Sequence, residues 1–492
     1  MNVLLIYPEF PDTFWSFKHA LKFIRKRAIL PPLGLLTAAA LLPPQWGRRL
    51  IDLNVTSLTN ADLEWADCAF VSGMIVQRQS VRHIIARCKR AGLKVVAGGP
   101  LFSAELDGFD EVDHFVLNEA EITLPRFLAD LAAGTPRRIY ATGEFPDLTC
   151  SPLPAWELVD LKRYASMGIQ FSRGCPFNCD FCNITAMLGR RFRIKTAAQI
   201  LAELDGLTAL GWKGPVFFVD DNFIGHKPYL KKQLLPALIA RRRQKGPIAF
   251  NTQVSINLAD DPELISMMVD AGFDTVFVGI ETPDNQSLVE CSKTQNRDRD
   301  LIADVRRIQR AGLQVQGGFI VGFDHDTPSI FQRQIEFIQN SGIVTAMVGI
   351  LQAIPGTRLY ERLAREGRLR GLTSGDNVDG TTNIVSAMSS DVLRDGYRRV
   401  LAAIYSPRGY YQRVRTFLRE YRAPSIKTPL SLNRLLAFVR SVFQLGVIGR
   451  ERVQYWKLLL WTLLRRPRHF SLAVTLAISG YHYRRICQLH LR

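Results

Sequence analysis

Three cysteines in one short segment carry the most specific chemical signal in the sequence. Cys175, Cys179 and Cys182 lie within eight residues, in the order C-x3-C-x2-C. Three thiolates at this spacing can hold three irons of a cubane, whereas clusters that only carry electrons usually have four cysteine ligands. The missing fourth ligand leaves one iron with an open coordination position, which marks a metal centre that binds substrate. The segment therefore predicts a 4Fe-4S cluster with one open iron.

A structural zinc site is the alternative for these thiols. Closed zinc sites use four ligands, and no His or further Cys lies near the segment in the sequence. Zinc is therefore disfavoured. The remaining cysteines are scattered and are expected to be small, mostly buried hydrophobic residues: Cys68, Cys88, Cys150, Cys291 and Cys487.

The elements around the cysteine segment predict a partial (β/α)6 barrel over residues 160–365. Short apolar runs alternate there with segments of helical pattern, and the cysteines follow the first run. Loops at the carboxyl ends of such strands carry catalytic residues. The expected strands are Ile169–Ser172, Val216–Asp220, Ala249–Val254, Thr275–Ile280, Gln314–Val321 and Ala346–Ala353.

Other polar and small residues follow the later strands of this barrel. Glu281 places a carboxylate at the expected mouth, with a surface-exposed glutamate as the alternative. Asp220 and Asp221 could orient a ribose or a substrate, and a solvated turn is an equal alternative. The glycine-containing stretches 317–323 and 354–357 permit close backbone approach but also suit packing or turns.

The first 145 residues show the pattern of a doubly wound, Rossmann-like sheet. Short β-branched runs alternate with helical stretches, and sheets of this kind bind ligands along the carboxyl ends of their strands. Residues 146–154 hold three prolines and are expected to be a linker. The expected strands are Val3–Tyr7, Arg49–Leu53, Ala69–Met74, Lys94–Gly98 and His114–Leu117.

The positive charge is concentrated at the C-terminal end. Residues 401–492 hold 17 Lys or Arg against Glu420 and Glu451, so +15 of the formal charge of +18 lies in the last fifth. We therefore expect the C-terminal segment to make whatever contact the positive charge serves. The charge does not indicate that the whole protein binds nucleic acid. Outside it, the sequence has no interleaved stripe of aromatic and basic residues.

Residues 375–492 are expected to form a helical extension with a basic amphipathic tail. The apolar runs 458–464 and 470–483 are shorter than the roughly 20 residues that span a bilayer, so no transmembrane helix is predicted. Residues 423–429 contain two prolines and suggest a hinge. Two interpretations of the tail stay open: an interfacial segment that attracts anionic headgroups and buries Trp and Leu, or a helical cap with a basic solvated face.

The cysteine segment, with Phe181 before its last thiol, resembles the radical S-adenosylmethionine (SAM) superfamily. The resemblance implies that the open iron binds SAM, whose reductive cleavage yields methionine and a 5′-deoxyadenosyl radical that takes a hydrogen atom from the substrate. No general acid or base is assigned, because hydrogen abstraction by a radical does not require one. The implied SAM-binding residues are Phe181, Gly279, Glu281, Pro355 and Gly356.

A sheet domain placed before such a barrel resembles the cobalamin-dependent branch of the superfamily. The D-x-H-x-x-G motif that supplies an axial histidine is absent, and Asn54 stands where that histidine would be. His19, His83 and His114 lie outside any such context, so cobalamin is expected without a histidine on cobalt. The implied cobalamin-binding residues are Pro32, Asp52, Asn54, Ser72, Gly73, Met74, Gly98, Gly99, Pro100 and Glu119.

The resemblance covers nearly the whole chain, and residues 375–425 resemble the helical extension of the subgroup that includes hopanoid methylases. It implies a C-methyltransferase that passes a methyl group from SAM through methylcobalamin to an unactivated carbon of a small molecule or a lipid such as a hopanoid. An electron donor such as flavodoxin or ferredoxin is the implied partner. The first residues run from Met1 directly into a strand pattern, so we expect no signal peptide and a cytoplasmic location, at the inner face of the membrane if the tail is interfacial.

Three other functions remain as alternatives. The same cofactors could drive a ring contraction, cyclisation or other rearrangement without methyl transfer. An RNA-modifying enzyme could use the basic tail on phosphates, although the chain has no second cysteine triad. A corrinoid carrier without activity would have little use for a cluster with an open iron.

Overall fold

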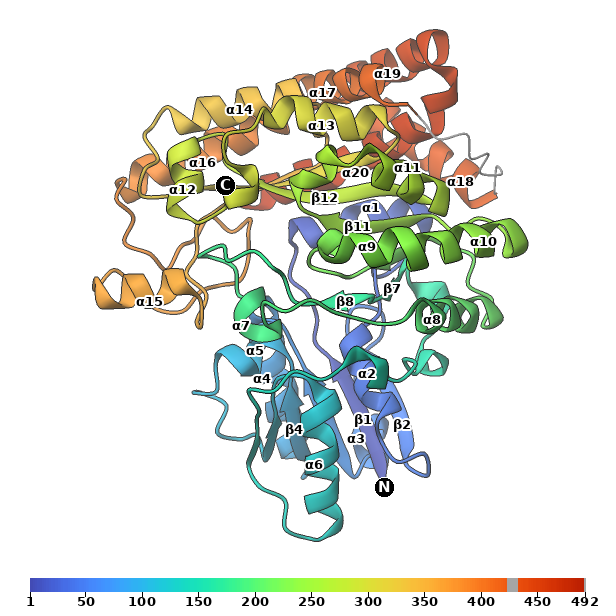
Figure 1. Ribbon diagram of the computed structural model, residues 1–492, viewed down its shortest axis with the longest axis vertical. Coiled ribbons are helices and arrows are strands. Elements are labelled where there is room, and N and C mark those ends of the chain that lie inside the picture. The colour runs from blue at the N-terminus through green and yellow to red at the C-terminus, as the bar shows by residue number, and fades with distance from the viewer. Residues whose placement is uncertain (423–431, 491–492) are drawn as a thin grey trace.

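The computed structural model describes residues 1–422 and 432–490. Figure 1 shows the sheet that carries the N-terminus at the bottom, the second sheet above it along the long axis of the molecule, and C-terminal helices such as α17 (Pro407–Glu420) and α19 (Arg452–Arg465) at the top. Each of the two main sheets has six strands. The predicted α/β class, with a helical C-terminal part, is therefore confirmed.

The first sheet is parallel, in the order β2-β1-β3-β4-β5-β6. Leu4 and Ile6 of β1 point into the core beneath α4, whereas Val3 and Leu5 point into the opposite core beneath α2 and α6. Both faces are thus covered, as in a doubly wound sheet. The strands are β1 (Asn2–Tyr7), β2 (Gly47–Asp52), β3 (Cys68–Ser72), β4 (Lys94–Gly98), β5 (His114–Val116) and β6 (Ile139–Tyr140). The helices are α2 (Leu33–Ala40), α3 (Asn60–Trp65), α4 (Arg78–Arg90), α5 (Pro100–Ala104) and α6 (Ala120–Ala132).

The second sheet is also parallel, and its strands lie side by side in chain order. β7 and β14 form its two edges, so the sheet is the open, partial barrel that the alternating pattern predicts. The strands are β7 (Met167–Ile169), β10 (Val216–Phe218), β11 (Phe250–Val254), β12 (Phe273–Glu281), β13 (Gln314–Val321) and β14 (Ala346–Ile350). The helices between and after them include α8 (Ala197–Ala209), α10 (Leu235–Lys245), α11 (Pro262–Ala271), α12 (Asn285–Glu290), α13 (Leu301–Arg310), α14 (Ile330–Ser341) and α15 (Arg358–Arg365).

The expected strand Ile169–Ser172 is split in the structure. β7 ends at Ile169, and the chain then forms β8 (Ser172–Arg173), which pairs with β9 (Arg193–Ile194) in a small antiparallel sheet. The split arises because the N–H groups of Phe171 and Ser172 donate to the carboxylate of Asp220, at 3.1 and 2.5 Å. The short helix α7 (Ile184–Leu188) lies between β8 and β9.

The C-terminal helices cover the barrel and return to the start of the chain. They are α16 (Ser390–Ile404), α17 (Pro407–Glu420), α18 (Leu432–Ser441), α19 (Arg452–Arg465) and α20 (Phe470–His490). The ring of His482 in α20 contacts the carbonyl of Phe14 at 3.1 Å, and α20 also packs on α1 (Lys18–Leu21). No described helix is both long and apolar enough to cross a bilayer. The predicted hinge at 423–429 lies outside the described residues.

Candidate active site: a three-cysteine loop between two sheets

The three cysteines lie on one loop between β8 and α7, which we call the cysteine loop (residues 174–183). Gly174 opens it with φ of +94°, and a Cβ there would stand 2.6 Å from the carbonyl oxygen of Arg191, so only glycine fits. The N–H of Cys175 donates to Gly189 at 3.3 Å, and the N–H of Cys182 donates to Cys179 at 3.2 Å. The loop is thus folded back on itself and anchored at both ends.

The three thiols suit a cluster better than a single ion. Burial raises the pKa of Cys175 and Cys179, and raises that of Cys182 to about 12, so the free thiols hold their protons and iron must displace them. Among the described residues, no group of three His, Cys, Asp or Glu side chains is placed to hold one ion. In a cubane each thiolate binds a different iron, so the ligands need not converge on one point. The residues present therefore fit a 4Fe-4S cluster.

A buried ion pair stands beside the cysteine loop. The carboxylate of Glu281, at the end of β12, accepts from Lys293 Nζ at 2.6 Å, and the Glu281 side chain is 8% and the Lys293 side chain 11% exposed. Burial by itself would lower the pKa of Lys293, but Glu281 and the thiols of Cys179 and Cys182 raise it above its usual value. The alternative of a surface-exposed Glu281 is therefore wrong. Its φ of +65° is unusual for a residue other than glycine.

The segment after α12 supplies residues that were not predicted from the sequence. Lys293 Nζ lies 5.9 Å from the ring centre of Phe181, and Gln295 donates to the sulfur of Cys179 at 3.8 Å. Asn296 donates to the carbonyls of Gly279 and Ile280, both at 3.0 Å. Lys293 precedes a single 3-10 turn (Thr294–Asn296) that holds the other two residues, and so short a segment shows no periodicity that could mark this role in the sequence.

The loop after β14 reaches the cysteine loop from the other side. Leu359 N–H donates to the carbonyl of Asp180 at 3.0 Å, and Arg358 pairs with the Asp180 carboxylate at 3.1 Å. Gly356, with φ of +82°, stands next to Ala186 of α7. The structure therefore brings all five predicted SAM-binding residues to the surroundings of the cysteine loop. That they bind SAM stays a prediction.

Asp220 has a structural role, and neither of its predicted alternatives describes it. Its carboxylate is fully buried and accepts from the backbone of Phe171 and from the backbone and hydroxyl of Ser172. Burial raises the pKa of Asp220 to about 7 despite these bonds. Asp220 thus fixes the turn that leads into the cysteine loop, and it is not free to bind a ribose.

Small residues form the ligand edge of the first sheet, at the carboxyl ends of β1, β3 and β4. Gly99 has φ of +91°, and a Cβ there would stand 2.5 Å from the hydroxyl of Ser72. The N–H of Leu101 donates to the carbonyl of Gly73 at 3.0 Å. The loops after β3 and β4 therefore pack against each other with almost no side chains between them. The strand order β2-β1-β3-β4-β5 puts its switch point at β1 and β3, where sheets of this order bind ligands.

Several predicted cobalamin-binding side chains are already engaged by the protein. The Asp52 carboxylate is buried and accepts from the hydroxyl of Tyr164 at 2.8 Å and from the Asn54 amide at 2.7 Å. Asn54 also donates to the carbonyl of Pro8 at 3.1 Å, and Pro32 begins α2 as its N-cap. In contrast, Met74 is exposed at this edge. The backbone N–H of Asn54 is engaged as well, since it donates to Asp52 at 2.9 Å.

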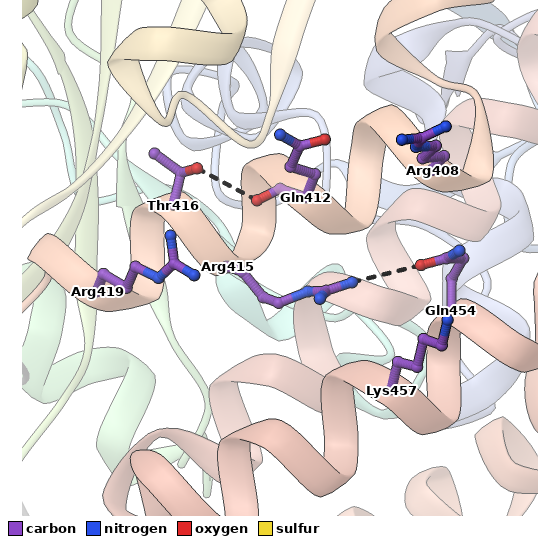
Figure 2. Close-up of a pocket in the computed structure, with 7 residues that line it drawn as sticks. All are labelled: Arg408, Gln412, Arg415, Thr416, Arg419, Gln454 and Lys457. Carbon is purple, nitrogen blue, oxygen red and sulfur yellow. Dashed lines mark hydrogen bonds between the residues drawn. The ribbon is translucent and has the colours of Figure 1, made fainter.

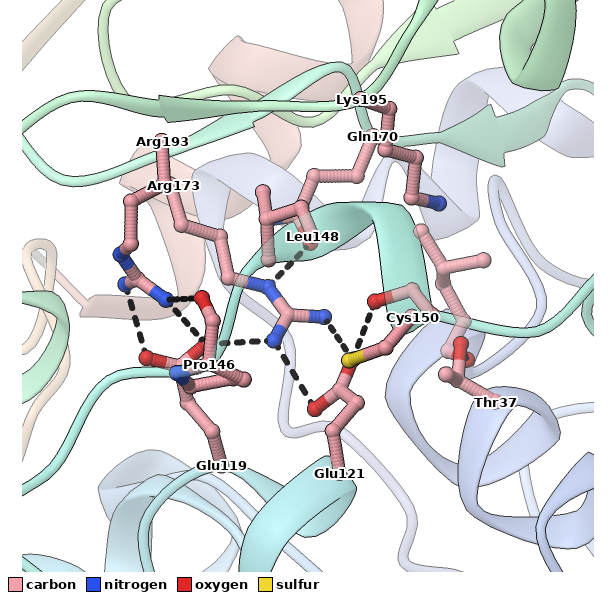
Figure 3. A network of polar contacts seen from close by, with 12 residues as sticks. Thr37, Glu119, Glu121, Pro146, Leu148, Cys150, Gln170, Arg173, Arg193 and Lys195 are labelled. Carbon is pink, nitrogen blue, oxygen red and sulfur yellow. Dashed lines mark hydrogen bonds and ion pairs between the residues drawn. The ribbon is translucent and has the colours of Figure 1, made fainter.

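Glu119 joins the first sheet domain to the small β8–β9 sheet through an ion cluster that Figure 3 shows. Its carboxylate pairs with Arg173 at 2.6 Å and Arg193 at 2.7 Å, both from the β8–β9 hairpin. Arg173 pairs in addition with Glu121 at 2.8 Å, and Ser151 donates to the same carboxylate at 2.6 Å. We call this set the interdomain clamp. It was not predicted, because nothing in the sequence relates residues 119–121 to residue 173.

The comparisons with known proteins agree with this site. A family model described as the radical SAM superfamily matches residues 169–338, and a domain of unknown function (DUF4070) matches residues 357–492. The chain is 40% identical over 491 residues to an uncharacterized methyltransferase, sll1242, of Synechocystis sp. (strain ATCC 27184 / PCC 6803 / Kazusa), covering 98% of this chain and 91% of the relative. It is 34% identical over 478 residues to the hopanoid C-2 methylase of Rhodopseudomonas palustris (strain TIE-1), covering 94% and 90%.

A solved structure has the same fold. It is the radical SAM methyltransferase TsrM from Kitasatospora setae with cobalamin and a 4Fe-4S cluster bound, with a TM-score of 0.60 at 16% identity, covering 93% of this chain and 98% of that chain. At this low identity the match shows a shared fold, and the shared fold includes both six-stranded sheets. The fold and the thiol triad thus define the class, an iron–sulfur enzyme that cleaves SAM. The chain belongs to the methyltransferases of the radical SAM superfamily.

Proposed function

We propose that this enzyme methylates an unactivated carbon of a polycyclic triterpenoid lipid such as a hopanoid, with cobalamin held by the first sheet. The observation that carries the substrate class is the match to the hopanoid C-2 methylase. At 34% identity it runs through 94% of this chain, so it includes the C-terminal helices as well as the two sheets.

The residues of the chain divide the work between the two sheets. The cysteine loop would hold the cluster, which when bound supplies radical chemistry from SAM. Glu281 and Lys293 present a buried carboxylate and ammonium beside it, 2.6 Å apart, and these groups could hold the polar ends of SAM. The small residues after β3 and β4 leave a surface on which a flat macrocycle can lie. A flavodoxin or ferredoxin is the proposed donor of the electron.

The interdomain clamp supports a cobalamin position between the first sheet and the cysteine loop. Arg173 immediately precedes Gly174 of the cysteine loop, and Glu119 immediately precedes α6 in the first sheet domain. The clamp therefore sets the distance between the ligand edge of the first sheet and the cysteine loop. Position 54, where an axial histidine would stand, is Asn, and its side chain donates to Pro8 and Asp52.

The tail supports contact with a membrane, where such a lipid resides. The predicted apolar run of α19 divides into two faces: Leu458 and Leu459 are buried, whereas Leu460 is 57% and Leu464 is 79% exposed. Large apolar residues exposed on α18, on the segment Val442–Ile448 and on α19 form one group in sequence. They are Leu435, Leu436, Val439, Phe443, Val447, Ile448, Val453, Trp456, Leu460, Leu463 and Leu464. α18 and α19 each contact the segment Val442–Ile448, and large apolar residues exposed on neighbouring elements favour a membrane or protein contact.

The decisive experiment is an assay of the reconstituted enzyme with SAM labelled in its methyl group and with detergent-dispersed triterpenoids. A labelled product heavier by one methyl group is expected. A product without label would instead establish a rearrangement and overturn the proposed methyl transfer. Labelling of a polar extract, with no label in the lipid fraction, would overturn the substrate class.

A further inference from the structure

A groove runs between α17 and α19, on the outer side of the C-terminal helices (Figure 2). Its volume is about 570 Å³. The side chains that line it are polar, and four of them are cationic: Arg408, Gln412, Arg415, Thr416, Arg419, Gln454 and Lys457.

The groove arises from the two-sided character of α17. Tyr410, Tyr411 and Phe417 are buried against the rest of the molecule, so the opposite face of α17 is turned outward. Arg408, Gln412, Arg415 and Arg419 follow one another on that face at helical spacing. Lys457 completes the opposite wall from α19.

The four cations of the groove lack acidic partners. Within residues 1–422 and 432–490, no ion pair with a carboxylate involves Arg408, Arg415, Arg419 or Lys457, and the acids nearest in sequence are used elsewhere: Glu420 pairs with Arg310 at 2.7 Å, and Glu451 pairs with Arg484. Burial and then the charge of Arg419 lower the pKa of Arg415. The positive charge of the groove is therefore not compensated.

The cations are held in place by neutral neighbours. Arg415 donates to the Gln454 side chain at 3.3 Å, and the guanidinium of Arg419 lies 5.9 Å from the ring centre of Trp461. These contacts fix the side chains across the groove without neutralising them. A guanidinium presents a planar set of donors that matches the oxygens of a phosphate.

The groove adjoins the exposed apolar residues of α19. On a helix with 3.6 residues per turn, Val453 and Leu460 lie next to Lys457 and Leu464 follows on the same face one turn beyond Leu460, whereas Leu458 and Tyr455 turn inward. A ligand in the groove would therefore meet cations on one side and an apolar stripe on the other. A lipid surface has this combination of an anionic headgroup and a hydrocarbon layer, whereas a nucleic acid does not.

We propose that the groove binds the phosphate of an anionic membrane phospholipid, while Leu460 and Leu464 enter the acyl region beside it. The inference rests on the membrane contact in the proposed function and adds a defined headgroup site to it. The site would orient the helical cap on the membrane.

The test is flotation of the full-length holoenzyme with vesicles of phosphatidylcholine alone or mixed with phosphatidylglycerol. The double variant Arg415→Gln/Arg419→Gln should bind the mixed vesicles roughly 30-fold more weakly, the loss expected for two cations that leave an anionic surface. The matched control Lys213→Gln/Arg243→Gln removes the same charge from exposed positions on the barrel and should bind like the unchanged enzyme. All proteins are also assayed for methyl transfer in detergent.

Each outcome separates the site from the proposed function. Equal losses in the double variant and the control would overturn the groove and leave only a net-charge effect. Undiminished vesicle binding by the double variant, together with a loss of binding to an RNA hairpin, would assign the groove to nucleic acid. If Leu460→Ser/Leu464→Ser binds vesicles as well as the unchanged enzyme, the two leucines do not enter the acyl region and that part of the proposal is wrong. Methyl transfer in detergent without any vesicle binding would overturn the membrane site alone.

Discussion

At the level of single residues, Lys293 connects the predicted SAM site to the cysteine loop. Its side chain is 11% exposed and its Nζ lies 2.6 Å from the carboxylate of Glu281, which needs the ammonium as its counter-ion. A buried charge whose partner is removed destabilises a protein strongly, whereas removal of both partners costs less. The ion pair can therefore be tested by a double-mutant cycle.

Lys293→Met should lower the free energy of unfolding of the cluster-free protein by about 3–5 kcal/mol, because Glu281 is left buried without a partner. Adding Glu281→Gln should recover much of that loss. Urea unfolding followed by circular dichroism measures both, with Lys213→Met at an exposed position as the control. A cost below about 1 kcal/mol for Lys293→Met would show that the pair is solvated.

Cys179→Ala should abolish cluster assembly and turnover, because two thiolates do not hold a cubane that needs three. Cys291→Ala is the matched control: Cys291 is buried outside the cysteine loop, and its bond to that loop is made by its carbonyl, which accepts from Asp180 at 3.0 Å. Iron analysis after reconstitution should find about four irons per chain in the control. Equal iron content in both variants would remove Cys179 from the ligand set.

At the level of elements, the small β8–β9 sheet is bound to the first sheet domain by the interdomain clamp. Burial would raise the pKa of Glu121 from 4.5, but Arg173 holds it at about 2. Since the folded pKa lies below the unfolded one, ionised Glu121 stabilises the fold above about pH 4.5. This contribution is lost as the pH falls from about 4.5 towards about 2.

Glu121→Gln should therefore flatten the acid side of the stability profile, where a shift of this size corresponds to roughly 3 kcal/mol. Thermal unfolding between pH 2 and pH 7 measures the effect. The exposed Glu64→Gln variant should keep the slope of the unchanged protein. If the Glu121 variant also keeps this slope, ionisation of Glu121 does not contribute to the pH dependence of stability.

Strands with a regular apolar pattern were predictable from the sequence. Elements whose ends are set by contacts between distant residues were not. Buried β-branched runs such as Gln314–Val321 and Lys94–Gly98 agree with the observed strands at both ends, because burial on both faces imposes their composition. The split of the strand at Ile169 could not be predicted, because the bonds to Asp220 span 48 and 49 residues. The two-residue strand β6 is too short to leave a pattern.

The same division holds in the site. The cysteines were evident from spacing alone, since ligands of one cluster lie close in the chain. Lys293 and Gln295 were missed because their role comes from folding next to Phe181 and Cys179, more than 100 residues earlier. Glu119 stands at the expected edge, yet its carboxylate pairs with arginines from the small β8–β9 sheet.

At the level of the whole molecule, the tail consists of two parts with different roles. α20 belongs to the main core, where Tyr483 and Ile486 are buried with residues of the barrel, whereas α18 and α19 expose apolar side chains. Removal of residues 470–492 should therefore unfold the protein and give aggregates on expression. Leu460→Ser/Leu464→Ser should change the midpoint of thermal unfolding by less than about 2 °C, because exposed positions contribute little. A well-folded truncated protein would contradict the assignment of α20 to the core.

The contact between α20 and the segment around Phe14 also constrains how the protein folds during translation. Phe14 leaves the ribosome among the first residues, yet Tyr483 and His482, which cover it, are translated more than 450 residues later. Domains generally fold as they emerge from the ribosome. The first sheet can therefore form while the Phe14 segment is still exposed to solvent, because α20 has not yet been translated. A nascent chain paused before residue 470 would thus display this apolar segment to chaperones, and translation of α20 would end that exposure.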